Sequence, residues 1–203
     1  MPEELTTKDH FQQLYAGVAP WDIGKPQPAL LAVADSITGN VLDAGCGTGE
    51  NALYFAERGQ PVTGIDFLEQ PIAEARRKSQ QRNVAATFLV RDALALTGLD
   101  EQFDSAIDCG LFHTFSDDDR GRYIENLAQL VKPNGRLFLL CFSDNEPPGE
   151  GPRRVTQQEI EVTFAKGWKV ESIQDTQFEI QPEFGELFSP GGPFAWLCVI
   201  RKV

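Results

Sequence analysis

The chain has 203 residues, of which 41% are hydrophobic and 24% are charged, a balance typical of one soluble globular domain with a sizeable core. Its formal net charge of −12 at pH 7 argues against nucleic acids and anionic membranes as partners, because their phosphates would be repelled. No apolar run approaches the roughly 18 residues of a membrane span, and the polar, acidic N-terminus lacks the features of a signal peptide, so we expect a cytoplasmic protein.

Apolar runs of strand length alternate with helix-like segments through most of the chain. The N-terminal part carries predicted helices at about residues 7–16 and 29–38. The centre follows as strand 40–44, helix 50–58, strand 61–66, helix 69–82, strand 86–90, strand 103–108, a helix from 116 to about 131, a turn at 132–135 and strand 136–142. This alternation predicts βαβ units and a doubly wound, mostly parallel α/β sheet.

The last third of the chain has a different pattern. It contains a Pro/Gly-rich loop at 143–154, a helix at 156–165, one or two strands at 169–173 and 177–180, a loop at 182–193 and a strand at 194–201. Thr156 and Glu159 have the spacing of a capping box at the start of the helix. We therefore expect a strand pair, joined without a long helix, to close the sheet.

Three glycines, Gly45, Gly47 and Gly49, follow the first predicted strand of the sheet and open its first helix. Glycine is costly on folding unless the backbone must approach a ligand or adopt positive φ, so this stretch predicts a ligand-binding loop. Ligands of open α/β sheets bind at this edge. The spacing differs from the GxGxxG of dinucleotide sites, and Asp43 would repel a pyrophosphate and attract a cationic amine. The pattern favours adenosine carrying an amino-acid tail.

Residues 43–49 (DAGCGTG) resemble the S-adenosylmethionine (SAM) motif of class I methyltransferases, and further motifs of that family follow at later strand ends. The resemblance, strong over residues 40–142, implies a Rossmann-like sheet of seven strands in the order 3-2-1-4-5-7-6, with the last strand antiparallel. It implies that Asp66 binds the ribose hydroxyls of SAM, that Asp92 accepts from the adenine amine, and that the segment from Asp108 lies beside the methyl group. The cofactor-binding candidates are Trp21, Gly24, Asp43, Ala44, Gly45, Cys46, Gly47, Gly49, Asp66, Phe67, Arg91, Asp92, Ala93, Asp108, Cys109 and Gly110.

Two shorter segments, residues 20–28 (PWDIGKPQP) and 111–113 (LFH), resemble small bacterial methyltransferases that act on small molecules. These include a thiol, thiopurine and tellurite type and a type that methylates heterocycles or quinones. In such relatives the tryptophan segment folds over the SAM tail and shapes the substrate mouth; a tryptophan that only packs in a surface loop is the alternative. The substrate-side candidates are Tyr15, Trp21, Phe112, His113, Phe184 and Phe188.

Histidine and acidic residues raise two further alternatives. His113 is a candidate general base, but a role in packing against the cofactor or holding backbone is favoured, because a lone histidine with no named partner is weak evidence for a base. Asp117, Asp118 and Asp119 follow Ser116 with capping spacing, which favours a helix N-terminus over a metal site. The four cysteines show no CxxC spacing and the chain has only two histidines, so we expect no metal site.

These observations predict one SAM-dependent methyltransferase domain, with an N-terminal helical cap at 1–39, a SAM-binding core at 40–142 and a substrate-side part at 143–203. The expected reaction transfers a methyl group to N, O or S of a small apolar or aromatic acceptor. The lack of an indispensable base favours a soft or easily ionised nucleophile. A thiol or metalloid methyltransferase is the alternative among enzymes, and a non-catalytic SAM-binding regulatory protein is the alternative outside them. The glycine spacing disfavours an NAD-binding oxidoreductase.

Overall fold

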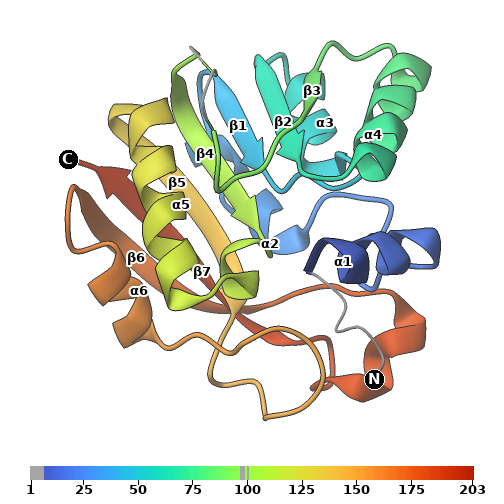
Figure 1. Cartoon of the computed structure of the whole chain (residues 1–203), viewed down its shortest axis with the longest axis vertical. Helices are drawn as coiled ribbons and strands as arrows, with labels where there is room; N and C mark the ends of the chain where they lie inside the picture. The colour runs from blue at the N-terminus through green and yellow to red at the C-terminus, as the bar shows by residue number, and fades with distance from the viewer. Residues whose placement is uncertain (1–6, 97–98, 100) are drawn as a thin grey trace.

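The computed structural model describes residues 7–96, 99 and 101–203, and over these residues seven strands form one sheet of order β3-β2-β1-β4-β5-β7-β6 (Figure 1). The strands are β1 (Val41–Ala44), β2 (Val62–Asp66), β3 (Thr87–Val90), β4 (Phe103–Cys109), β5 (Val131–Phe142), β6 (Trp168–Gln177) and β7 (Phe194–Lys202). The pairs among β1 to β5 are parallel, whereas β7 runs antiparallel to both β5 and β6. The predicted topology is confirmed.

Helices cover both faces of the sheet. They are α1 (Thr7–Ala16), α2 (Pro28–Leu31), α3 (Glu50–Glu57), α4 (Glu69–Arg82), α5 (Asp117–Leu130) and α6 (Gln157–Thr163), with short 3₁₀ turns η1 (Ala34–Ser36), η2 (Phe112–Thr114) and η3 (Pro182–Leu187). Buried side chains of α5 and α6 pack on one face, and those of α2, α3 and α4 pack on the other (Figure 1). Helix α1 lies against α4. No helix in the described part of the chain is long and apolar enough to cross a membrane.

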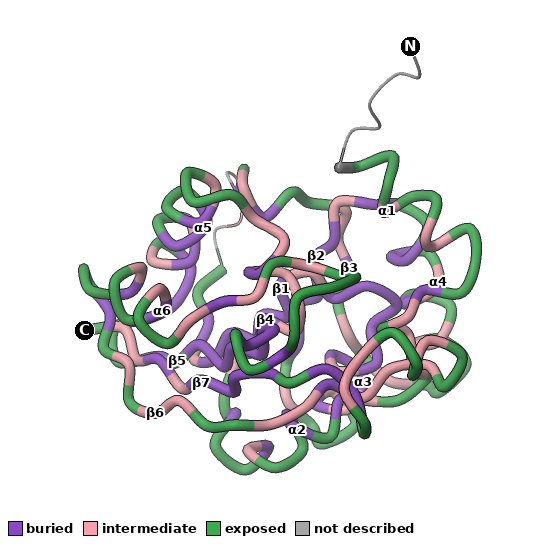
Figure 2. The backbone as a smooth tube through the Cα atoms, turned by 90° about the horizontal axis from the view of Figure 1, so that it is seen from below, coloured by how far each residue is buried: buried purple, intermediate pink, exposed green. Residues whose placement is uncertain are grey.

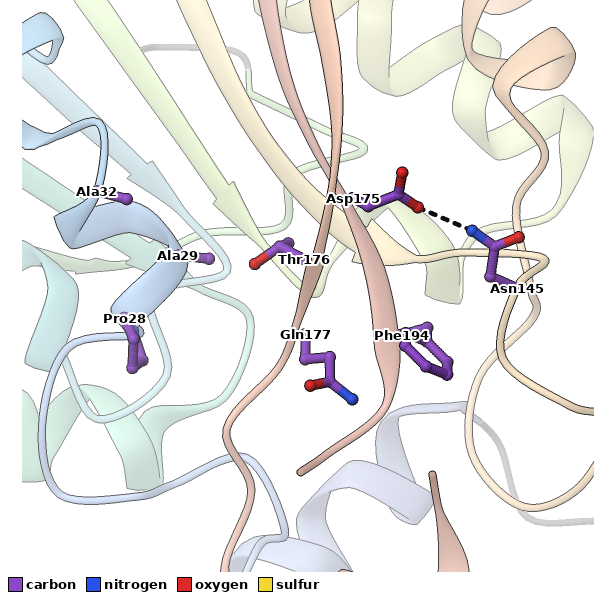
Figure 3. Close-up of a pocket in the computed structure, with 8 residues that line it drawn as sticks. All are labelled: Pro28, Ala29, Ala32, Asn145, Asp175, Thr176, Gln177 and Phe194. Atoms are coloured by element: carbon purple, nitrogen blue, oxygen red, sulfur yellow. Dashed lines mark hydrogen bonds between the residues drawn. The ribbon is translucent and has the colours of Figure 1, made fainter. Parts of the chain in front are cut away.

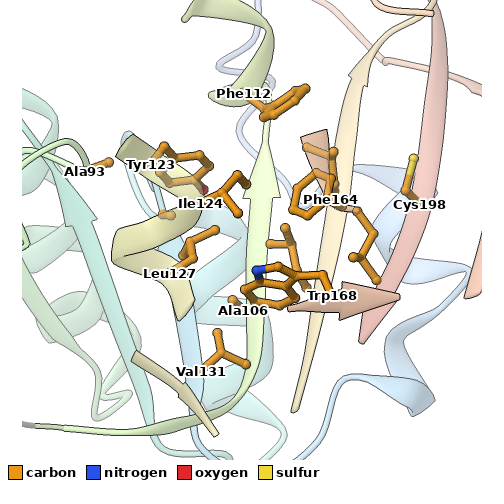
Figure 4. Close-up of a cluster of buried hydrophobic side chains, with 14 of the residues drawn as sticks. Ala93, Ala106, Phe112, Tyr123, Ile124, Leu127, Val131, Phe164, Trp168 and Cys198 are labelled. Atoms are coloured by element: carbon orange, nitrogen blue, oxygen red, sulfur yellow. The ribbon is translucent and has the colours of Figure 1, made fainter. Parts of the chain in front are cut away.

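Strands β1 and β2 are buried along their whole length, as expected for parallel strands covered on both faces. Figure 2 shows this central burial along the backbone tube. On the α5 face, Tyr123 and Leu127 pack toward Phe164 and Trp168 from the C-terminal part of the chain (Figure 4). The core therefore joins the C-terminal part to the parallel sheet.

Two predicted helix starts are confirmed by their caps. Ser116 accepts the backbone N–H of Asp119 at the start of α5. Thr156 and Glu159 form a complete capping box at the start of α6, in which each side chain accepts the other residue's backbone N–H. The acidic run after Ser116 therefore lies at a helix N-terminus, where negative charge is favourable.

Two local predictions differ from the structure. The expected helix at 29–38 is two shorter pieces, α2 and η1, because the chain turns to bury Ile37 and to bond Thr38 to Ser105. The expected turn at 132–135 is an irregular stretch within β5. Phe103 pairs with Val131 but Ser105 pairs with Arg136, so the intervening residues bulge outward, with Asn134 at φ 65°.

In the C-terminal segments, the residues expected to form one or two strands, at 169–173 and 177–180, form the single strand β6, which ends at Gln177. The expected loop at 182–193 contains η3, whose first turn begins at Pro182. Proline suits the first position of such a turn because its φ is already fixed near the helical value.

Candidate functional site

The glycine loop lies between the carboxyl end of β1 and the start of α3. Gly49 caps α3 in a left-handed conformation, at φ 85°. A side chain at Gly47 would lie 2.7 Å from the Tyr15 hydroxyl, so α1 already covers the loop closely. The backbone N–H of Cys46 donates to Ile65 in β2 at 2.8 Å, which fixes the loop against the next strand. The candidates Ala44 and Gly45 continue this backbone; Ala44 is fully buried, and Gly45 faces the Leu111 side chain.

Asp43 is the most unusual acid in the site. It is fully buried at β1, and neither carboxylate oxygen makes a well-formed hydrogen bond in the described residues; the backbone N–H of Ala52 faces the carboxylate and lowers its pKa, which offsets only part of the effect of burial. Burial, together with the nearby charges of Asp108 and Asp66, raises the pKa of Asp43 to about 7. A buried carboxylate without a partner is costly, so this position is suited to a cationic ligand group.

Asp66 ends β2 beside the same loop. Its carboxylate accepts the backbone N–H of Gly47 at 3.2 Å and that of Leu68 at 3.0 Å. Burial raises its pKa above the ordinary value, against the effect of these hydrogen bonds. The half-buried candidate Phe67 follows Asp66 and packs edge-on against Phe11 of α1, with ring centroids 6.0 Å apart. The structure therefore brings Asp66 together with the glycine loop.

The third strand end carries one exposed carboxylate. Asp92 accepts the backbone N–H of Leu94 at 2.8 Å, and its side chain lies at the surface. Arg91 is also exposed and bonds the Val90 carbonyl, whereas Ala93 is buried in the core. Of the three candidates here, Asp92 has the side chain best placed to accept from a ligand.

Asp108 lies at the carboxyl end of β4, and its carboxylate is already hydrogen-bonded by groups of the protein itself. Its carboxylate accepts the backbone N–H groups of Leu111 and Phe112 and the hydroxyl of Tyr123, all within 3.2 Å. Burial nevertheless raises its pKa to about 6. Asp108 thus holds the turn that carries Gly110, which has φ 84° and donates its N–H to Leu140. The thiol of the neighbouring Cys109 has a raised pKa, chiefly because of burial.

His113 is held as a neutral ring. It is 6% exposed, and its Nδ1 accepts the backbone N–H of Phe142 at 2.9 Å. Burial, followed by the positive charge of Arg120, lowers its pKa to about 3. The ring also packs edge-on against Phe142, with centroids 5.0 Å apart. Because the Nδ1 lone pair is already used and Nε2 must carry the proton, this geometry favours the packing role of His113 over the role of general base.

Tyr15 and Trp21 form an aromatic cover beside the glycine loop. The Trp21 indole N–H donates to the Tyr15 hydroxyl at 3.1 Å, and the two rings meet edge-on. Phe11 packs edge-on against Trp21 from one turn earlier in α1. Trp21 remains 36% exposed, and Gly24 beyond it is exposed with φ 71°. These rings lie where a ligand of the glycine loop would meet the solvent.

The structure separates the predicted substrate-side phenylalanines. Phe112 is wholly buried, with the Arg120 guanidinium 4.5 Å from its ring centroid and Phe164 nearby, so it packs in the core, and its place on the substrate side stays a prediction. Phe188 is half-buried and packs edge-on against Phe142. Phe184 is half-buried in η3.

Several residues that sequence reasoning missed complete this side of the site. Phe142 and Phe178 pack against each other and against His113. Glu146 is buried, and its two oxygens accept the backbone N–H groups of Ser189 and Phe194. Phe142 ends an apolar strand at the ligand edge of the sheet, and this position in the sequence could have marked it as a candidate site residue. The contacts of Glu146 span 43 and 48 residues, and no local pattern marks them.

A separate groove of about 760 Å³ lies between α2 and the ends of β6 and β7 (Figure 3). Its lining includes Pro28, Gln177 and Phe194, and a hydrogen bond joins Asn145 to Asp175. None of the predicted site residues lines it. We also find no cluster of three or more potential metal ligands within residues 7–96, 99 and 101–203.

The pattern that defines a methyltransferase domain matches residues 41–135. A 2-heptyl-1-hydroxyquinolin-4(1H)-one methyltransferase of Mycobacteroides abscessus is 33% identical, over 95% of this chain and 88% of that protein. A probable thiol methyltransferase 2 of Arabidopsis thaliana is 30% identical, over 84% and 77%. A structure solved in work on the conversion of a disulfide bond into a thioacetal group during echinomycin biosynthesis is 36% identical, with a TM-score of 0.84 over 95% and 91% of the two chains.

Proposed function

The chain belongs to the SAM-dependent methyltransferases, and from this premise we propose that it methylates an acidic N-hydroxy oxygen or a thiol sulfur of a small aromatic acceptor. SAM, when bound, supplies a methyl group activated by the positive charge of its sulfur. The chain's own residues must bind both molecules, align them and exclude water. The buried, unpartnered carboxylate of Asp43 is the single observation that carries the proposed position of the cofactor.

The residues at the glycine loop fit SAM. Asp43 offers a negative charge to a cationic amine, which relieves the cost of its burial. We propose that Asp66, beside the loop, accepts from the ribose hydroxyls and that the exposed Asp92 accepts from the adenine amine. We propose that Asp108, Cys109 and Gly110 contribute through the backbone of their turn, because the Asp108 carboxylate is occupied by the protein.

The acceptor side is apolar and lacks a free base among the candidate residues. His113 has a pKa of about 3 and an occupied Nδ1, and burial raises the pKa of Tyr15 above its ordinary value. An acceptor here must reach the methyl group already ionised or already nucleophilic. The similar proteins named above act on an N-hydroxyquinolone and, as a probable assignment, on thiols. An N-hydroxy group of this kind and a thiol both ionise more easily than a simple phenol. We therefore favour the N-hydroxy oxygen and the thiol sulfur as acceptor atoms.

A thiol methyltransferase is the second candidate, supported by the similarity to the Arabidopsis protein. The two candidates differ in the size and flatness of the acceptor. The half-buried Phe188 over Phe142 favours a flat aromatic acceptor over a small aliphatic thiol.

The test begins with calorimetry of the protein with SAM and with NAD. Tight SAM binding and no NAD binding are expected. Labelled SAM is then incubated with a 2-alkyl-1-hydroxyquinolin-4-one, thiophenol, a small aliphatic thiol, phenol and an N-heterocycle. Label transfer should be fastest to the N-hydroxyquinolone or to thiophenol. Equally fast transfer to phenol at neutral pH would overturn the requirement for an easily ionised acceptor, and a failure to bind SAM would overturn the whole proposal.

A further inference from the structure

The segment of residues 20–27, here called the strap, runs between two parts of the site that are far apart in sequence. One of its edges contacts the glycine loop, and the other contacts residues 179–181, which follow Phe178 at the end of β6. We infer that the strap couples the cofactor loop to the acceptor side, and that Asp22 is the positioning residue through which this coupling passes. The inference rests on the proposed function, since it takes the glycine loop to be the SAM site.

A directional hydrogen-bond chain fixes the strap to the glycine loop. The Lys78 ammonium donates to the Thr48 hydroxyl at 2.8 Å, and that hydroxyl lies 3.0 Å from the Asp22 carboxylate. An ammonium group has donors only, so the Thr48 oxygen must accept from Lys78 and its single proton must point to Asp22. Glu50 holds Lys78 in place through a nearly buried ion pair at 2.8 Å. Thr48 lies between Gly47 and Gly49, so a ligand that orders the loop also orders this chain.

The opposite edge of the strap binds the acceptor side. The backbone N–H of Gln181 donates to the Pro20 carbonyl at 2.8 Å, and its side-chain amide donates to the Asp22 carbonyl. Gln27 is buried and exchanges two hydrogen bonds with the backbone of Glu179, at 2.8 and 3.0 Å. Asp22 therefore contacts the glycine loop through its side chain and the acceptor side through its backbone.

This arrangement predicts a linkage between the two binding events. When SAM fixes Thr48, the strap is held by Asp22, and residues 179–188 are held in turn. Coupling free energies of this kind correspond to roughly 5- to 150-fold changes in affinity and act in both directions. The Asp22 carboxylate is bound by the Thr48 hydroxyl and is not among the residues proposed to hold either ligand, so its loss should reduce the coupling more than it reduces SAM binding.

The experiment is hydrogen exchange on the full chain with S-adenosylhomocysteine as the probe, which requires no acceptor. In the wild type, exchange should slow by about fivefold or more in residues 43–50 and also in residues 179–188. In Asp22→Ala, protection of 43–50 should persist while that of 179–188 falls by about fivefold. Asp35→Ala is the matched control, because Asp35 makes one exposed ion pair with Arg58, outside the strap.

Conservative variants keep the test independent of folding defects. Asp22→Asn and Thr48→Ser retain an accepting oxygen and a hydroxyl, so both should restore protection of 179–188, whereas Thr48→Val should not. Acrylamide quenching gives a second readout: Trp21 is 36% exposed, whereas Trp168 and Trp196 are each 4% exposed. The probe should shield Trp21 in the wild type and should shield it less in Asp22→Ala, because the strap that carries Trp21 is then no longer held to the glycine loop.

The outcomes separate the inference from the proposed function. Equal protection of 179–188 in the wild type and in Asp22→Ala would overturn the coupling role of Asp22. Protection of 43–50 without any protection of 179–188 in the wild type would also overturn it, with the SAM site intact. No protection of 43–50 in the wild type would instead overturn the proposed SAM site.

Discussion

At the residue scale, Asp43 combines full burial with two unpartnered oxygens. Its pKa is raised from 3.8 to about 7, so the ligand-free fold gains stability from its proton below about pH 4 and loses that stability as the pH rises through about 7. A cation beside the carboxylate lowers the same pKa, because it favours the charged form. Ligand binding and proton release are therefore linked at this residue.

The linkage predicts the pH dependence of SAM binding. Affinity should be full above pH 7 and should fall as the pH drops through about 7, by up to about tenfold per unit, because Asp43 must lose its proton. Calorimetry in two buffers of different ionisation enthalpy measures the affinity and the proton released. Asp43→Asn should bind weakly with a flat pH profile. A wild-type affinity that is constant from about pH 5.5 to pH 8 would contradict the prediction.

Asp66→Ala should weaken SAM binding by about 1.5–3 kcal/mol, the scale of hydrogen bonds to charged groups. The carboxylate also accepts from Gly47 and Leu68, so part of the loss should appear as lower thermal stability of the ligand-free protein. Titration calorimetry and thermal unfolding separate the two effects. Unchanged SAM affinity would show that the ribose hydroxyls bind elsewhere.

His113→Asn should keep turnover within a few-fold of the wild type, because the Asn side-chain oxygen can accept the Phe142 N–H in place of Nδ1. His113→Ala should lower the free energy of unfolding by about 1–3 kcal/mol, since it leaves that buried N–H unpaired. Steady-state kinetics and chemical denaturation measure both changes. If His113 were a base, both variants would lose about 10²- to 10⁴-fold in turnover.

At the element scale, local signals predicted the elements more reliably than their connections. Ser116 and Thr156 cap their helices as their spacing indicated, because a cap depends on residues only three positions apart. The composition around Asn134 is that of a turn, so the sequence predicts a turn there. The pairing of β5 with β4 that makes this stretch part of a strand is non-local and leaves no local signal. The bonds between Gln27 and Glu179 span 152 residues and could not be foreseen.

Glu146 joins the loop after β5 to the segment before β7, and it offers a test at this scale. Glu146→Gln replaces one accepting oxygen by a donor that faces a backbone N–H, so the free energy of unfolding should fall by about 1–3 kcal/mol. SAM affinity should not change, because the glycine loop is untouched. Glu150→Gln, at an exposed position of the same loop, is the control for chemical denaturation. Equal stability of the two variants would contradict the joining role.

At the scale of the whole molecule, the net charge of −12 acts on both ligands before they bind. It attracts a cationic cofactor and repels an ionised acceptor, and salt screens both effects. Raising the ionic strength from about 0.02 to 0.2 M should therefore increase kcat/KM for an ionised N-hydroxyquinolone and decrease it for SAM. Neutral acceptors should show little change. If salt changed kcat/KM in the same direction for SAM and for the ionised acceptor, this account of the protein's electrostatic field would be contradicted.

The overall topology was predictable because the ordered motifs fix the strand ends of β1 to β5 and the resemblance supplies the rest. The carboxylates of Asp43, Asp66 and Asp108 follow the same logic, since each lies at the carboxyl end of a largely buried strand. Prediction was weaker on the acceptor side. Phe112 and Phe188 look alike in sequence, and only tertiary packing places the first in the core and leaves the second half-buried.

The order of strands at the end of the sheet has a consequence for how the chain is made. In the described sheet β6 pairs only with β7, although β6 comes earlier in the chain. Since β6 ends at Gln177 and β7 begins only at Phe194, β6 leaves the ribosome first and remains an unpaired edge until β7 follows. The parallel part, with the cofactor residues, can assemble earlier. The acceptor side is therefore the last to form during synthesis, and β6 is the segment of the nascent chain on which a chaperone would act.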